Sequence, residues 1–288
     1  WKSSRIRSNC LSIAEINSEN VENKAIIYAK EKLSINARGL ENEGGGEINA
    51  QSIDITTAND FVNKSKIISS NSLKINSDNL LNDGVVAASL DLNILIKNDF
   101  ENNGQVSSGE DLRLDAKTIN NGKNNSKAII ISEKSFELKA LDNIVNKGEI
   151  ASKQGLAIVS NNGLNNYNLI SADNISEIET AKIANYSGAE ISAHGAINIG
   201  KTSSIINEGT ILSTGNLNIG GELNGLENNG KSALIASSGG EVLIDGDAGI
   251  KNSGTIFAKL ALNINAAGGD VANDNIINSQ NDLVKISA

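Results

Sequence analysis

One short pattern recurs along almost the whole chain: an apolar residue, any residue, and then asparagine. It occurs thirteen times in register, at Asn23, Asn42, Asn63, Asn82, Asn102, Asn121, Asn146, Asn166, Asn185, Asn207, Asn228, Asn252 and Asn273. Successive asparagines are 19 to 25 residues apart. A stack of similar turns requires such near-constant spacing, because each turn must return above the one before it. The repeat therefore predicts one elongated solenoid, although 288 residues would otherwise suggest two globular domains.

Each repeat also contains a short segment of alternating apolar residues, the pattern of a half-buried strand. The pairs are Leu33/Ile35, Ile53/Ile55, Leu73/Ile75, Leu112/Leu114, Phe136/Leu138, Leu156/Ile158, Ile197/Ile199, Leu217/Ile219, Val242/Ile244, Leu262/Ile264 and, with one residue extra, Leu283/Ile286. Leu11 and Ile13 resemble a first pair. Strands this short pair most simply with their copy one repeat later, which gives a parallel sheet. We expect an all-β parallel β-helix of about 13 turns of about 20 residues.

The recurring asparagines are expected to form a structural ladder, in which side-chain amides hydrogen-bond from turn to turn and fix the register. A glycine two residues later follows many of them, at Gly44, Gly84, Gly104, Gly148, Gly209, Gly230 and Gly254. Asparagine takes that place at Asn168 and Asn275. Because glycine and asparagine best tolerate a left-handed backbone, we expect a left-handed corner at this point of each turn.

Composition agrees with a thin core of stacked aliphatic residues: 39% of residues are hydrophobic, 3% are aromatic, and Pro and Met are missing. A net charge of −9 argues against a nucleic-acid partner. No apolar run is long enough for a membrane-spanning helix. The chain starts with Trp1 and stops just after a strand-like segment, so we expect an internal piece of a longer protein. Residues 1–20 are predicted to be an irregular first turn or cap, and residues 21–288 a single elongated repeat domain truncated at both ends.

The three longest intervals between ladder asparagines locate insertions, which leave a solenoid as loops and often form its binding face. They lie near residues 122–127, near residues 230–232 and 237–240, and near Ser187–Gly188 or Lys201–Thr202. The candidate receptor contacts in the first two regions are Lys123, Asn124, Asn125, Lys127, Lys231, Ser237 and Ser238.

No residue is predicted to be catalytic, to bind a cofactor or to bind a metal. His194 is the sole histidine and is expected to be a solvated turn residue, and Cys10 is the sole cysteine. The carboxylates of Glu241, Asp245, Asp247 and Asp270 raise the alternative of a polysaccharide lyase or hydrolase, or of a calcium site. A lyase needs a basic residue beside such carboxylates, and no arginine lies in this region.

Three motifs recur about every twenty residues: the apolar-x-Asn-x-Gly corner, an Ile-x-Ser/Ala step such as Ile150–Ser152, and a Gly-x-Leu-x-Ile strand such as Gly215–Ile219. On these motifs the chain, from about Val21 to its end, resembles filamentous haemagglutinin. It is similar more broadly to the large exoproteins of two-partner secretion, including the effectors of contact-dependent growth inhibition. The amino-terminal secretion module of that family uses Asn-Pro motifs, and this chain has no Pro.

The resemblance implies a right-handed parallel β-helix that is exported through an outer-membrane β-barrel transporter and displayed on a Gram-negative cell surface. It further implies a non-catalytic shaft that acts as an adhesin or as a stalk for a receptor-binding or toxin region. The sequence does not separate these two roles. The alternative of another class remains a polysaccharide-active enzyme on a β-helix scaffold.

Overall fold

The computed structural model describes residues 6–7, 12–247 and 249–288. Every regular element in these residues is a β-strand, and the parallel strands stack as a β-solenoid of about 14 turns. The chain divides into two compact units, residues 1–137 and 138–288, and the division falls inside strand β18 (Phe136–Ala140). The predicted parallel β-helix is confirmed, while its right-handed winding and the single-domain organisation stay predictions.

Seventeen strands lie in the first unit before β18. They are β1 (Ile6–Arg7), β2 (Ile13–Asn23), β3 (Ile26–Tyr28), β4 (Lys32–Asn42), β5 (Glu47–Ala50), β6 (Ser52–Thr57), β7 (Asp60–Asn63), β8 (Lys66–Ser69), β9 (Leu73–Ser77), β10 (Asn79–Asn82), β11 (Val85–Ala88), β12 (Leu92–Ile96), β13 (Asp99–Asn102), β14 (Gln105–Ser108), β15 (Leu112–Ala116), β16 (Thr118–Asn121) and β17 (Ile129–Ser132).

The second unit continues in the same order. Its strands are β19 (Asn143–Asn146), β20 (Glu149–Ser160), β21 (Gly163–Asn166), β22 (Leu169–Thr180), β23 (Lys182–Asn185), β24 (Glu190–Ala193), β25 (Ile197–Gly200), β26 (Ser204–Asn207), β27 (Thr210–Ser213), β28 (Leu217–Ile219), β29 (Leu226–Asn228), β30 (Leu234–Ser237), β31 (Val242–Gly246), β32 (Ile250–Asn252), β33 (Thr255–Ala258), β34 (Leu262–Ala266), β35 (Val271–Asn273), β36 (Ile276–Ser279) and β37 (Val284–Ser287).

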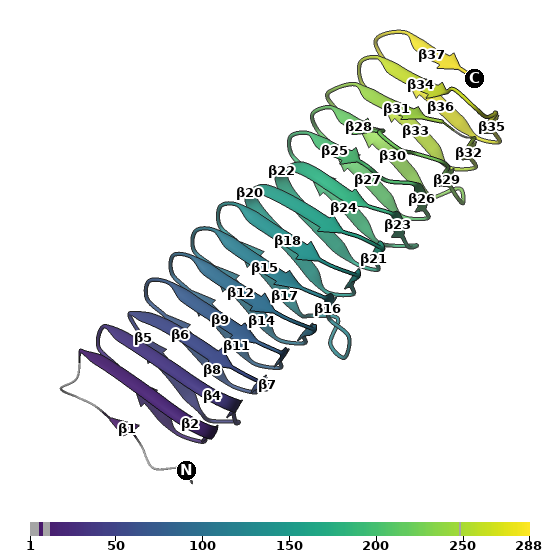
Figure 1. Ribbon diagram of the computed structural model, residues 1–288. Coiled ribbons are helices and arrows are strands. Elements are labelled where there is room, and N and C mark those ends of the chain that lie inside the picture. Colours follow the sequence, from purple (N-terminus) through teal and green to yellow (C-terminus); the bar gives the residue numbers. More distant parts are fainter. Residues whose placement is uncertain (1–5, 8–11, 248) are drawn as a thin grey trace. The chain divides into compact units, whose positions relative to one another are not determined.

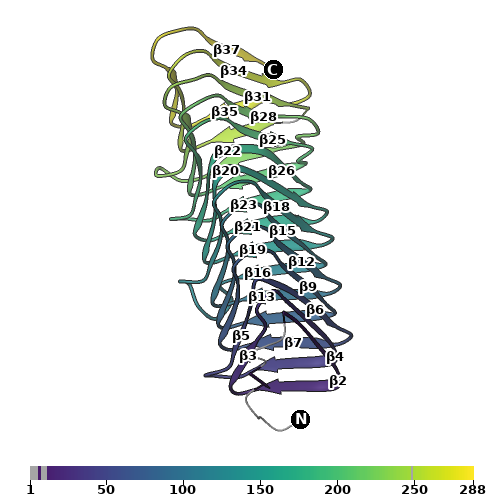
Figure 2. The ribbon, with the colours of Figure 1, turned by 90° about the vertical axis from the view of Figure 1, so that its left-hand side faces the viewer.

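Within each unit a strand pairs in parallel with its counterpart one turn later, as Figure 1 and Figure 2 show from two directions. Most strands pair with the third strand along the chain, because a turn contains three strands. In the pairing of β10 with β13, for example, Leu80 lies opposite Phe100 and Asn82 opposite Asn102. Residues of the same type therefore stack in columns.

The core consists of the inward columns of these strands. From Leu40 to Ile250, the strands that end in a ladder asparagine contribute one buried apolar residue each, such as Leu80, Phe100 and Ile205. The next strand of each turn contributes a second, and the third strand contributes the alternating pair, such as Ile53 and Ile55. At roughly 1.5 to 3 kcal/mol for each buried aliphatic side chain, these columns dominate the stabilising free energy before conformational entropy is subtracted.

The sequence pattern missed two of the alternating pairs. Leu92 and Ile94 fit the pattern and pair in register with Leu73 and Ile75. In β22 one extra residue separates Ile175 from Ile178, and the register with β20 shifts there as in a β-bulge. A rule of strict alternation does not recognise a pair interrupted in this way.

Both ends of the predicted pattern need correction. Leu11 and Cys10 lie outside the described residues, and Ile13 is exposed, so the first alternating pair is Ala14 and Ile16, opposite Leu33 and Ile35. Strand β2 runs through the boundary that the sequence placed at residue 20.

In the last turn the residue opposite Leu262 is Val284. Leu283 was predicted for this place, but it is 66% exposed. The extra residue is thus absorbed before the strand and not within it.

Candidate functional site

The asparagine ladder of the first unit joins six consecutive turns. Asn23 donates through Nδ2 to Asn42 Oδ1 at 2.8 Å, and this bond recurs at 2.7 to 2.8 Å up to Asn121. The amide of each donor also contacts a backbone carbonyl of the next turn, as Asn82 Nδ2 does with the Gln105 carbonyl at 3.1 Å. These asparagines are 0 to 5% exposed, so each side-chain amide is shielded from water and forms its hydrogen bonds within the protein instead.

The second unit holds a ladder of the same design. It runs from Asn146 through Asn166, Asn185, Asn207, Asn228 and Asn252 to Asn273, with distances between Nδ2 and the next Oδ1 of 2.7 to 2.9 Å. All members except Asn273 are buried. A buried amide without a hydrogen-bond partner costs about 1 to 3 kcal/mol of folding free energy. A shift in strand register that separated two of these side chains would therefore destabilise the fold.

Four of the glycines that lie two residues after a ladder asparagine have a different role from the one predicted. Of the corner glycines, Gly230 has a positive φ, of 92°, whereas Gly84, Gly104, Gly209 and Gly254 have no left-handed backbone. A Cβ atom on these four would lie 2.0 to 2.3 Å from a backbone oxygen of an earlier turn. Close stacking of successive backbones therefore excludes a side chain there.

In the loop of residues 122–127, residues 123–127 are exposed, and the loop bends back onto the preceding turn. Lys123 Nζ lies 2.8 Å from Glu101 Oε2, and Asn124 Nδ2 donates to Glu101 Oε1 at 2.9 Å. Asn125 Nδ2 donates to the Asn103 carbonyl at 2.8 Å. Burial raises the pKa of Glu101, but hydrogen bonds from Lys123 and Asn103 outweigh it, so this pKa lies below its ordinary value. Lys127 is exposed on the same loop.

The second insertion places Lys231 and Ser232 on an exposed loop after Gly230. Ser238 is also exposed. Ser237, which was predicted as a receptor contact, is the last residue of β30 and is fully buried. Its Oγ donates to the Gly215 carbonyl at 2.6 Å and accepts from Gly240 N at 2.8 Å. Ser237 is therefore a structural residue, and a partner does not reach it in this structure.

The third insertion is divided between two corners. Gly188 has a φ of 79° in the turn Tyr186–Ala189, and Lys201 has a φ of 45° at the other corner. Lys201 Nζ pairs with Glu179 Oε1 at 2.5 Å, while Thr202 is buried.

A stacked tyrosine pair on the corner surface was missed from the sequence. The rings of Tyr167 and Tyr186 are parallel to within 6°, with centroids 4.0 Å apart, and Lys147 Nζ lies 5.6 Å from the Tyr167 centroid. The interaction with Tyr186 and partial burial raise the pKa of the Tyr167 phenol. The signal was present, because each tyrosine directly follows a ladder asparagine in consecutive repeats.

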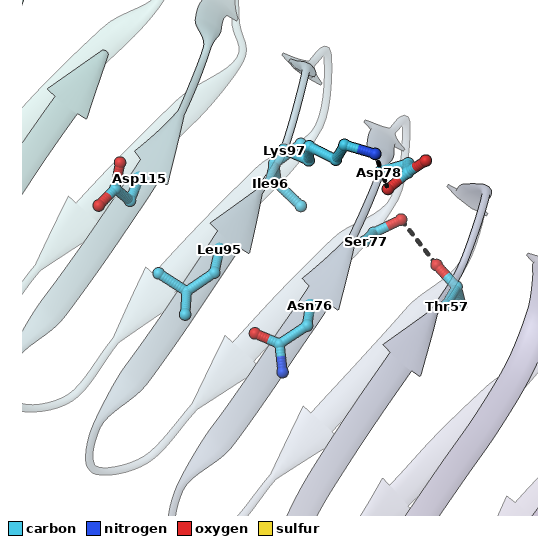
Figure 3. Close-up of a pocket in the computed structure, with 8 residues that line it drawn as sticks. All are labelled: Thr57, Asn76, Ser77, Asp78, Leu95, Ile96, Lys97 and Asp115. Carbon is cyan, nitrogen blue, oxygen red and sulfur yellow. Dashed lines mark hydrogen bonds and ion pairs between the residues drawn. The ribbon is translucent and has the colours of Figure 1, made fainter. Parts of the chain in front are cut away.

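A shallow hollow on the outer surface of the first unit is shown in Figure 3. Its floor includes Thr57 and Ser77, whose hydroxyl oxygens are 2.7 Å apart, and Ile96 takes their place one turn later. Lys97 Nζ crosses it to Asp78 Oδ1 at 3.5 Å. The hydroxyl of Ser77 also contacts the Asn79 carbonyl at 2.6 Å. The buried hydroxyls of this hollow are thus already used within the protein.

The remaining candidates of the sequence analysis are dispersed on the surface. Glu241, Asp245, Asp247 and Asp270 are all exposed, and Asp245 Oδ1 accepts a hydrogen bond from Asn265 Nδ2 at 2.8 Å. His194 Nδ1 lies 3.2 Å from Asp173 Oδ1, and its side chain is 88% exposed. In the part of the chain that the structure describes, no three His, Cys, Asp or Glu residues are grouped so that they could hold a metal ion. The same part contains no helix that could span a membrane.

Comparison with known proteins agrees with this geometry. The family model of the haemagglutinin repeat matches residues 7–65 and 68–184, which is more than half of the chain. Beyond the match, the strand order and the asparagine ladder continue to Asn273. No curated protein matches the chain, and no solved structure does. The chain belongs to the haemagglutinin repeat family, and its stacked parallel strands form a repeat shaft of the filamentous haemagglutinin type.

Proposed function

We propose that this chain is a non-catalytic β-helical shaft of a secreted, surface-displayed exoprotein. Export would follow two-partner secretion through an outer-membrane β-barrel transporter of a Gram-negative bacterium. The shaft acts in adhesion, or as the stalk that presents a receptor-binding or toxin region. Membership of a family whose members are typically structural or adhesive supports this proposal.

The observation that carries the proposal is the uniformity of the turns within each unit. Every turn is joined to its neighbours by parallel strand pairing, by apolar columns and by an asparagine bond of 2.7 to 2.9 Å. A body built from nearest-neighbour contacts keeps its stability as turns are added, so its length is free to set the reach of what it carries. An enzyme instead needs one particular constellation of side chains.

The exposed insertions are the proposed places of receptor contact. Lys123, Asn124, Asn125 and Lys127 lie on the loop of the first unit. Lys231 and Ser238 lie on the exposed segments of the second unit. The loop of the first unit is preorganised by its hydrogen bonds to Glu101 and Asn103, which lowers the entropy lost when a partner binds.

Removal of one whole turn tests the shaft. Deleting residues 167–185 joins Asn166 to Tyr186 and leaves every remaining turn complete, whereas deleting residues 167–176 removes half a turn and breaks the columns. We expect the whole-turn deletion to keep a cooperative thermal transition by circular dichroism, and the half-turn deletion to lose it. Equal damage by both deletions would contradict a stack of interchangeable turns.

Surface display and the enzymatic alternative need separate measurements. In the producing cell, antibodies to this chain should label intact cells when the transporter gene is present and should not when it is deleted. Labelling that survives the deletion would argue against two-partner secretion. Incubation of the purified chain with acidic and neutral polysaccharides should release no product, and any product that depends on the chain would favour the enzyme.

A further inference from the structure

One outward sheet face of the second unit carries no charged side chain over four consecutive turns. It is formed by β27, β30, β33 and β36, which lie side by side in Figure 1. The first outward row consists of Thr210, Leu234, Thr255 and Ile276. We call this surface, together with the second row described next, the uncharged face.

The second outward row of the uncharged face consists of Leu212, Ala236, Phe257 and Asn278. Ala236 is only 3% exposed, because it lies between the larger side chains of Leu212 and Phe257. Phe257 is only half-buried here, whereas Phe61, Phe100 and Phe136 are fully buried in core columns. A large aromatic side chain on a solvent-facing strand position is typical of an interaction surface.

The strands of the uncharged face have sequences typical of strands buried on both sides. Leu234, Ile235 and Ala236 are consecutive apolar residues, as are Ile256 and Phe257 in the next turn. Parallel sheets that are covered on both faces have such continuous apolar runs, whereas a sheet with one wet face alternates apolar and polar residues. In this unit the core covers only the inner face.

The other outward faces of the same unit are charged. The face of β29 and β32 carries Glu227 and Lys251, which form an ion pair at 3.4 Å. The face of β31 and β37, in the same turns, carries Asp245 and Lys285, which are both exposed. Absence of charge is therefore specific to one of the three faces over these turns.

From this arrangement we propose that the uncharged face binds the same face of a second copy of the chain, as a two-fold symmetric dimer. Each chain carries a net charge of −9, so two copies repel each other wherever charged faces meet, and the uncharged face is the surface that avoids this repulsion. Two-fold symmetry brings identical patches together, which is the commonest way for identical chains to pair.

The spacing of the rows also favours a second copy over an unrelated globular partner. Stacked turns place the outward side chains about 4.8 Å apart along the column. A sheet with the same spacing can interdigitate with several rows at once, and a second copy supplies one. In the second row the small Ala236 lies between the large Leu212 and Phe257, and the side chains of facing sheets about 10 Å apart interdigitate.

Sedimentation of the purified chain tests the dimer. Between about 1 and about 100 µM, a range that spans the dissociation constants of weak to moderate complexes, the sedimenting mass should rise toward twice the chain mass. Added salt should strengthen the dimer, because it screens the repulsion between the acidic chains and leaves the apolar contact intact. A dimer held by ion pairs would weaken in salt and would overturn the assignment.

Matched variants locate the interface. Phe257→Glu and Leu212→Glu each place a charge on the uncharged face, and each should weaken association at least tenfold while the circular dichroism spectrum stays unchanged. Leu243→Glu is the control, because Leu243 is equally apolar and is 41% exposed on the outward side of β31, away from this face. A wild-type chain that stays monomeric at the highest concentration in high salt would overturn the proposal, as would association lost in Leu243→Glu and kept in Phe257→Glu.

Discussion

The asparagine ladder is most directly tested by Asn207→Asp, which keeps the shape of the side chain and exchanges its amide for a carboxyl group. Asn207 is fully buried. Its Nδ2 donates to Asn228 Oδ1 at 2.8 Å, to the Leu234 carbonyl at 3.0 Å and to the Gly209 carbonyl at 3.1 Å. In the variant a carboxyl oxygen would face these three acceptor oxygens. The aspartic acid can make one hydrogen bond there while protonated, and none once ionised.

The expected loss of stability depends on pH. Burial and the facing oxygens raise the pKa of the new carboxyl group in the folded state above its value of about 3.9 in the unfolded chain. Below the unfolded pKa both states are protonated, and only the missing hydrogen bonds count, about 1 to 3 kcal/mol. As pH rises from the unfolded pKa to the folded pKa, the free energy of unfolding falls by about 1.4 kcal/mol per pH unit. The destabilisation at pH 7 therefore exceeds that at low pH by about 1.4 kcal/mol for each pH unit by which burial raises the folded pKa.

Urea unfolding followed by circular dichroism at pH 4 and pH 7 measures this difference. Asn281→Asp is the surface control, because Asn281 is exposed and its variant should show no added pH dependence. Asn207→Ala removes the amide without adding an ionisable group, so its destabilisation should be similar at both pH values. Equal destabilisation of Asn207→Asp at pH 4 and pH 7 would refute the argument that the ladder requires a donor at this position.

Three further substitutions test the columns, the corner and the loop. Ile219→Asp should unfold the turns around β28, because it buries an unpaired charge at a position 1% exposed. Leu243→Asp, at an outward position 41% exposed on the neighbouring strand β31, should have little effect on thermal melting. Gly104→Ala should lower the melting temperature, because its Cβ would lie 2.0 Å from the Gly84 carbonyl oxygen. Gly44→Ala should be tolerated, because no atom lies within 4 Å of a Cβ at that position. Equal melting temperatures of the two variants would contradict the close approach of the two backbones at Gly104. The contacts of the Glu101 carboxylate with the loop are present above the ordinary carboxyl pKa and are lost as pH falls through the depressed pKa of Glu101, so hydrogen exchange in residues 122–127 should accelerate in acid. Glu101→Gln should remove that acid-dependent change. If the change persists in this variant, another group is responsible for it.

Spacing predicts most of this fold because a solenoid repeats one local solution. The interval between asparagines and the alternation of pairs such as Leu33 and Ile35 are both short-range properties, and stacking converts them directly into register. The pair Ile175 and Ile178 escaped because a bulge inserts a residue without changing what is buried. Ser237 was misplaced because a buried serine that bonds to backbone resembles, in sequence, the polar residues of a loop.

The corner glycines show a different limit of sequence reasoning. A glycine after Asn-x is consistent with a left-handed turn and also with a close approach of two backbones. Only the three-dimensional stack separates these causes, because the atom that excludes a side chain at Gly104 belongs to Gly84, one turn earlier. Outward features such as the uncharged face are also obscure in sequence, since strands β27, β30, β33 and β36 are separated by more than a dozen residues in the chain.

The direction of the ladder distinguishes its failure from an ordinary core defect. In the second unit every bond runs from Nδ2 of one turn to Oδ1 of the next. In Asn207→Asp, the oxygen that accepts from Asn185 remains, and Asn185 Nδ2 also keeps its contact with the Thr210 carbonyl at 3.0 Å. The donor toward Asn228 is lost. At pH 7 hydrogen exchange should therefore accelerate in the turn of Asn228 more than in the turn of Asn185. A buried charge such as Ile219→Asp lacks this polarity and should affect the turns on both sides alike. Symmetric loss of protection around Asn207→Asp would mean that the asparagines act only as buried filler, without the directed bonding that sets the register.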